Sequence, residues 1–175
     1  HNLVDHVPVE KYAVPIGRAR VAREGQDVTV VAHSYMVLEA LRCADLLSEH
    51  DVSVEVVDLR SIRPIDSKTI LNSVAKTKRL IAADNGWTNY GVSSEVISII
   101  CENIFDELVC KPERIGVNES PSPSTRALAN YTYPRANNLV ARISDMFHLN
   151  LDLIKTNIGG KTSLDVPDPT FKGPF

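Results

Sequence analysis

The residues best placed to do chemistry lie in one charged loop that follows an apolar, strand-like run. Residues 58–66 read Asp-Leu-Arg-Ser-Ile-Arg-Pro-Ile-Asp, so Asp58, Arg60, Arg63 and Asp66 put carboxylates and guanidinium groups at a strand end. A loop that only reverses the chain is more often built from Gly, Asn and Ser. Two interpretations stay open: an internal salt-bridge cluster, or a rigid charged surface that contacts a partner.

Five other residues could take part in catalysis or binding. His33 beside Ser34 suggests a base and a nucleophile, but adjacent residues at a strand end point in opposite directions and no G-x-S-x-G turn surrounds them. We therefore interpret Ser34 as a helix cap. Asp84 precedes an Asn-Gly pair and is typical of a turn-forming aspartate. Trp87 and Tyr90 are candidate interface anchors, with local packing of their own loop as the alternative.

The motifs that hold phosphates or metals are absent from the sequence. Residues 31–35 read Val-Ala-His-Ser-Tyr where a G-x-G-x-x-G turn would approach a pyrophosphate, and no P-loop is present. The five histidines are scattered, without the spacing of metal ligands. We predict no catalytic residue, no cofactor-binding residue and no metal ligand in this chain.

Composition narrows the class of protein. The chain has 175 residues, 43% of them hydrophobic and 23% charged, with a formal net charge of −3. These values are ordinary for a globular domain and give no basic footprint for nucleic acid. The apolar runs are too short to span a bilayer. Three cysteines without CxxC spacing favour a reducing compartment.

Predicted strands and helices alternate along the chain and would position these loops. Apolar, β-branched runs predict strands at 27–32, 51–57, 79–83 and 114–117. Apolar residues at helical spacing predict helices that start near Ser34, Asp66, Ser93 and Arg135. This alternation favours a parallel sheet covered on both faces. Residues 17–25 read as a basic connection and 84–91 as a loop.

Several segments together resemble a known family. They are Val-Pro-Ile-Gly at 14–17, Asp-Leu-Arg-x-Ile-x-Pro-x-Asp at 58–66, Tyr-Gly-Val-Ser-Ser-Glu at 90–95, and the helix that begins Tyr-Pro-Arg-Ala at 133. Between about residues 12 and 148 the chain resembles the C-terminal domain of the transketolase superfamily. Within it, the β subunit of the thiamin-dependent 2-oxo acid dehydrogenases, of the pyruvate dehydrogenase first-component type, is most similar.

The resemblance implies a fold and a role. The fold is α/β, a three-layer α/β/α domain over residues 11–149 with a mixed, mostly parallel five-stranded sheet whose first strand is antiparallel. Residues 1–10 would be the end of a preceding domain or a linker, and 150–175 an extended tail. The role is the C-terminal assembly domain of a β subunit. The alternatives are the C-terminal domain of a transketolase or deoxyxylulose-phosphate synthase, and a stand-alone binding module without catalysis.

The resemblance also implies cofactors and partners. The full enzyme would be an oxidoreductase that uses thiamin diphosphate and Mg, whereas this chain alone would be inactive and bind neither. Expected partners are an α subunit, a second β subunit and a dihydrolipoyl acyltransferase core, without nucleic acid or membrane, in a bacterial cytoplasm or a mitochondrial matrix. After the fourth predicted strand the family reads Gly-Ala-Asp-Val-Pro-x-Pro, but this chain departs from that pattern at 116–125. The 2-oxo acid therefore stays open. The interface candidates are Asp58, Arg60, Arg63, Asp66, Trp87 and Tyr90.

Overall fold

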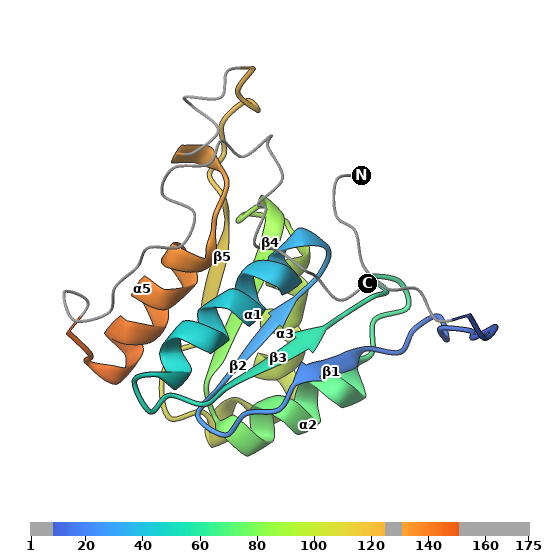
Figure 1. Cartoon of the computed structure of the whole chain (residues 1–175), viewed down its shortest axis with the longest axis horizontal. Coiled ribbons are helices and arrows are strands. Elements are labelled where there is room, and N and C mark those ends of the chain that lie inside the picture. The colour runs from blue at the N-terminus through green and yellow to red at the C-terminus, as the bar shows by residue number, and fades with distance from the viewer. Residues whose placement is uncertain (1–8, 125–130, 151–175) are drawn as a thin grey trace.

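The computed structural model describes residues 9–124 and 131–150 of the chain. Within these ranges the chain folds into a single sheet with α-helices on both of its faces (Figure 1). The predictions made for residues 1–8 and for the tail at 151–175 lie outside the described residues.

Five strands form the sheet in the order β1-β3-β2-β4-β5. β1 runs antiparallel to β3, and the other neighbouring pairs are parallel. The predicted mixed, mostly parallel sheet is therefore confirmed. The strands are β1 (Arg20–Arg23), β2 (Val28–Ala32), β3 (Val54–Asp58), β4 (Leu80–Trp87) and β5 (Glu113–Val117).

Helices cover the sheet in two layers. α1 (Tyr35–Ser48) and α5 (Ala136–Phe147) pack on one face, and α2 (Ser67–Thr77) and α3 (Val92–Ile104) pack on the other. A short 3₁₀ helix, η1 (Phe105–Glu107), follows α3. The central strand β2 is buried along its whole length, as expected for a strand with apolar layers on both sides. The three-layer α/β/α arrangement is the predicted one.

A buried carboxylate fixes the last helix against the first. Glu39 of α1 is only 1% exposed, and its Oε2 accepts a 2.7 Å hydrogen bond from the backbone N–H of Ala136. Its Oε1 accepts from Arg135 at 3.3 Å and from Arg42 at 2.9 Å. A buried charge needs such partners, so this cluster holds the N-terminal end of α5 at one position on α1.

The structure corrects three boundaries that were read from residue patterns. β1 lies inside 17–25, which the pattern presented as a connection, because an edge strand with arginines lacks an apolar run. β4 continues to Trp87 instead of ending at residue 83, since an irregularity in the ladder lets Trp87 pair with Val117. α3 begins after Gly91 rather than at a serine cap, and it ends at Ile104.

The helix starts agree with the remaining predictions, with one difference in detail. Asp66 is the N-cap of α2 and accepts the Thr69 backbone N–H, as the sequence predicts. Ser34 occupies the N-cap position of α1, but its side chain makes no capping hydrogen bond and its φ is 53°. Among the described residues, no helix has the length and apolar character that a membrane crossing needs.

Candidate functional site

The carboxyl edge of the sheet carries the residues that the sequence singles out. Asp58 is the last residue of β3, and its Oδ1 accepts a 3.1 Å hydrogen bond from the Arg60 backbone N–H. The Arg60 Nε lies 3.9 Å from the Asp58 Oδ2. Arg60 has a φ of 53°, in the left-handed region that costs free energy for a residue with a side chain. Asp58 therefore stabilises a tight turn directly after the strand.

Asp66 closes the other end of the same loop. Its Oδ1 accepts a 3.2 Å hydrogen bond from the Thr69 backbone N–H, and its Oδ2 accepts from the Thr69 hydroxyl at 2.8 Å. Oδ2 also accepts a 3.0 Å bond from the backbone N–H of Ala19. Burial raises the pKa of Asp66, but these hydrogen bonds and the nearby charge of Arg18 outweigh burial and hold the pKa below its ordinary value.

The segment before β1 packs along this loop. The Gly17 backbone N–H donates a 2.9 Å hydrogen bond to the Ser61 hydroxyl. Gly17 has a φ of +76°, and a Cβ at this position would lie 2.7 Å from the Cγ of Pro64, whose peptide bond to Arg63 is cis. Glycine is therefore required here, both for its backbone conformation and for close approach.

Charged and apolar side chains of these two segments face solvent together. Arg60 and Arg63 are exposed, Ile62 is 52% exposed, and Ile16 of the neighbouring segment is 83% exposed. Within the described part of the chain, Arg63 makes no hydrogen bond or ion pair. We call Ile16, Arg18, Arg60, Ile62 and Arg63 the arginine–isoleucine surface. Its backbone is fixed from within. The side chains of Ile16, Ile62 and Arg63 face solvent, whereas the Arg60 side chain is 29% exposed and lies against Asp58.

A second exposed group follows β4. Trp87 ends this strand with 54% of its surface exposed, and Tyr90 is 97% exposed with a φ of 59°. β2 lies between β3 and β4 in the sheet, so this group and the arginine–isoleucine surface occupy the same edge but are separated by one strand. Neither aromatic residue belongs to the two core clusters; local packing covers nearly half of the Trp87 surface and almost none of Tyr90.

Between these groups lies a polar pair that the residue patterns did not reveal. The His33 Nε2 at the end of β2 and the Asp84 Oδ1 in β4 lie 3.0 Å apart. Asp84 also accepts the backbone N–H groups of Gly86 at 2.8 Å and of Val92 at 2.9 Å. Burial raises the pKa of Asp84, but the hydrogen bonds from His33 and from the two backbone N–H groups have the larger combined effect and lower the pKa to about 2. The carboxylate thus joins β2, β4 and the start of α3.

This pair lacks the other parts of a catalytic set. Across residues 9–124 and 131–150, no hydroxyl or thiol group is hydrogen-bonded to His33, and Ser34 is exposed. The same ranges contain no group of three or more His, Cys, Asp or Glu side chains that could hold a metal ion. Nucleophilic catalysis needs a base in contact with its nucleophile. The pair therefore has the geometry of a structural contact that joins β2 to β4.

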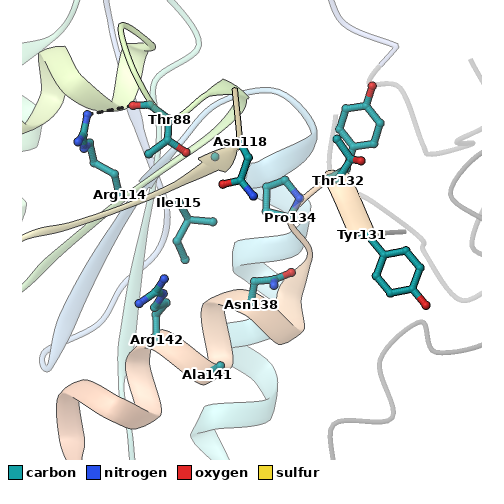
Figure 2. Close-up of a pocket in the computed structure, with 12 residues that line it drawn as sticks. Thr88, Arg114, Ile115, Asn118, Tyr131, Thr132, Pro134, Asn138, Ala141 and Arg142 are labelled. Atoms are coloured by element: carbon teal, nitrogen blue, oxygen red, sulfur yellow. Dashed lines mark hydrogen bonds between the residues drawn. The ribbon is translucent and has the colours of Figure 1, made fainter. Parts of the chain in front are cut away.

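A groove opens farther along this edge, between β5 and α5 (Figure 2). Its volume is about 380 Å³. Thr88, Gly116 and Asn118 line it on the side of the sheet, and Asn138 and Arg142 line it on the side of the helix. The lining is mainly polar. No sequence pattern indicated this groove, because its residues come from separate segments: Thr88, residues 114–118 and residues 131–142.

Comparison with known proteins identifies the fold. Residues 17–139 match the family described as "Transketolase, C-terminal domain". The chain belongs to this family. A solved structure titled "Split gene transketolase, inactive beta4 tetramer" superposes on this transketolase C-terminal domain with a TM-score of 0.69 and 29% identity. The superposition covers 79% of this chain and 45% of that one.

Curated relatives of this transketolase C-terminal domain are named as pyruvate dehydrogenase E1 β subunits. The chain is 39% identical over 139 residues to "Pyruvate dehydrogenase E1 component subunit beta, mitochondrial" of Dictyostelium discoideum, covering 79% of this chain and 39% of that protein. It is 40% identical over 139 residues to the protein of the same name from Drosophila melanogaster, covering 79% and 38%. It is 37% identical over 137 residues to the bacterial β subunit of Acholeplasma laidlawii, covering 78% and 42%. The chain thus spans about two fifths of the relatives' length.

The structure of this transketolase C-terminal domain places the six interface candidates on one edge and divides their roles. The carboxylates of Asp58 and Asp66 bind groups of their own loop, whereas Arg60, Arg63, Trp87 and Tyr90 point their polar or apolar surface to solvent. The aspartates thus fix the loop internally, as the first interpretation has it, and Arg63 remains on the surface. Contact of this loop with a partner stays a prediction.

Proposed function

We propose that this chain is the C-terminal assembly domain of the β subunit of a thiamin-diphosphate-dependent 2-oxo acid dehydrogenase, with pyruvate as the expected substrate. The observation that carries the proposal is an identity of 37–40% to proteins named as pyruvate dehydrogenase E1 β subunits, over more than three quarters of the chain. The solved transketolase is 29% identical, which favours the dehydrogenase over a transketolase.

The described residues support a role in assembly rather than in chemistry. The carboxyl edge offers neither a nucleophile bonded to His33 nor a cluster of metal ligands, in residues 9–124 and 131–150. These residues contain no cluster of ligands for Mg, and in this proposal thiamin diphosphate and Mg are held by other parts of the enzyme. The domain itself is proposed to span residues 11–149, with 1–10 as a linker and 150–175 as a tail.

The proposed contacts are the exposed side chains at this edge. Arginine and the large aromatic residues contribute most of the binding free energy in many interfaces, which suits Arg60, Arg63, Trp87 and Tyr90. Exposed Ile16 and Ile62 add apolar area beside the arginines. The proposed partners are a second β subunit, an α subunit and a dihydrolipoyl acyltransferase core. A solved neighbour named as a β4 tetramer supports self-association.

The proposed location follows from the relatives. Those from eukaryotes are named as mitochondrial, and others are bacterial, so a mitochondrial matrix or a bacterial cytoplasm is proposed. The stand-alone binding module is the remaining alternative. A simple observation separates them: coding sequence in the same frame upstream of His1 that encodes a pyrimidine-binding domain supports the β subunit. A start codon immediately before His1 contradicts it.

A biochemical test uses the α partner. The chain, continued by its upstream coding sequence, is co-expressed with a tagged α subunit from the same genome. A stable complex with equal numbers of the two chains is expected, and double substitution of Arg60 and Arg63 by Ala should weaken it. A folded β chain that never co-purifies with the α subunit overturns the proposal.

A further inference from the structure

The groove between β5 and α5 has an unusual charge for this chain. The chain as a whole carries a formal net charge of −3. The described residues that line the groove include Arg114 and Arg142 but no Asp or Glu. The carboxylate of Glu113 lies outside the lining, with its Oε2 3.7 Å from the Arg142 Nη1. The positive charge of the groove therefore comes mainly from Arg142 and is partly offset by Glu113.

The two arginines differ in how firmly they are held. The Arg114 Nη1 donates to the Thr88 carbonyl at 2.9 Å and to the Ser94 hydroxyl of α3 at 2.7 Å, so its guanidinium is directed toward α3 and away from Arg142 (Figure 2). The Arg142 side chain is 56% exposed, and its only ion pair within the described residues is the 3.7 Å contact to Glu113. In Figure 2 its side chain extends from α5 toward β5. Since a guanidinium has five N–H donors, most of those on Arg142 remain available.

Amide groups add neutral donors on both walls. The Asn138 Oδ1 accepts the Arg135 backbone N–H at 2.8 Å, which fixes the side chain and leaves its NH₂ group as a donor. Asn118 lines the opposite wall from the end of β5. Fixed amide and guanidinium donors around a cavity without acidic residues are complementary to a ligand rich in acceptor oxygens.

We propose that this groove binds a small anion through a phosphate or carboxylate group, with Arg142 and the two asparagines as its main contacts. The volume of about 380 Å³ lies in the range of small-molecule sites and suits a metabolite rather than a macromolecule. The site is on the opposite sheet edge from β1 and the arginine–isoleucine surface. It does not depend on the proposed assembly role, and it could make the domain respond to a metabolite.

The single tryptophan of the chain gives a direct readout. Trp87 precedes Thr88, which lines the groove, and pairs with Val117 at the end of β5. The whole 175-residue chain is titrated with inorganic phosphate and, separately, with succinate, at constant ionic strength set with chloride. Fluorescence and isothermal titration calorimetry are both recorded. Saturable binding of at least one probe is expected, and the tighter one identifies the preferred group.

Matched variants test the location of the site. Arg142→Met should weaken the affinity about tenfold, because a hydrogen bond to a charged group is lost. Lys68→Met removes the same charge from an exposed position on α2, on the other face of the sheet, and should leave the affinity unchanged. The proposal is overturned if neither probe binds saturably by either method, or if the two variants weaken binding equally.

Discussion

The buried carboxylate of Asp66 accepts a hydrogen bond from the backbone N–H of Ala19 at 3.0 Å, across 47 positions of sequence. The same side chain caps α2 through Thr69. One residue thus joins the segment before β1, the loop at 58–66 and a helix. The loop presents Arg60 and Arg63 at fixed positions because its ends are tied in this way.

Replacement of Asp66 by Ala should lower the free energy of unfolding by about 2 kcal/mol, since it removes a helix cap and leaves the Ala19 N–H without its acceptor. Urea unfolding followed by circular dichroism measures the change. Asp106→Ala, at an exposed position of η1, is the control and should change stability by less than about 0.5 kcal/mol. Equal losses in the two variants would contradict the role of Asp66.

Asp84 makes stability depend on acid pH. Its pKa is about 2 in the folded chain against an ordinary value of 3.8, so the folded state favours the ionised carboxylate. The resulting contribution of about 2 kcal/mol is complete above pH 3.8 and is lost as the pH falls toward 2. Urea unfolding between pH 5 and pH 2 should show this loss in the native chain. Asp84→Asn should show a smaller one, and parallel pH curves for the two proteins would refute the assignment.

Arg63 should matter for association and not for folding. It is exposed and has no hydrogen bond or ion pair within the described ranges, so Arg63→Ala should change the free energy of unfolding by less than about 0.5 kcal/mol. The same variant should weaken self-association in sedimentation equilibrium, by about tenfold if Arg63 is an interface anchor. Lys68→Ala is the matched control. A large loss of stability with unchanged association would favour a purely internal role for the loop.

The chain alone should not bind thiamin diphosphate together with Mg²⁺ as a cofactor. The sequence lacks a diphosphate-binding motif, and residues 9–124 and 131–150 contain no cluster of metal ligands that could hold the accompanying cation. Calorimetric titration of thiamin diphosphate into the chain should show no binding that depends on Mg²⁺, since the anion groove proposed above needs no cation. Mg²⁺-dependent binding at micromolar affinity would show that the domain contains a cofactor site of its own.

Residue patterns predicted most of the fold where burial is periodic. β2, β3, α1 and α2 were found because their apolar residues recur at strand or helix spacing. β1 was missed by pattern and expected only from the family, because its two half-buried apolar residues, Val21 and Ala22, stand between arginines and form no apolar run. The end of β4 was missed since Asn85 and Gly86 normally mark turns.

The sequence predicted those parts of the candidate site that lie within a single loop, but not the contacts between loops. The loop at 58–66 was recognisable because its charged residues follow one strand directly. The pair of His33 and Asp84 depends on two strands that are neighbours in the sheet but separated by 51 positions in sequence. The sequence did show that His33 and Asp84 each follow a predicted parallel strand. Whether the two side chains meet depends on the order of the strands in the sheet, which the sequence pattern does not give.

The most direct test of the central proposal is an assay of 2-oxo acid decarboxylation. The chain, continued by its upstream coding sequence, is purified with its α partner and assayed with thiamin diphosphate, Mg²⁺ and several 2-oxo acids. We predict decarboxylation of pyruvate that requires thiamin diphosphate and that falls when Arg60 and Arg63 are both replaced by Ala, in step with loss of the assembled complex. An assembled complex that decarboxylates none of the 2-oxo acids, or full activity from a complex that lacks residues 11–149, would contradict the account.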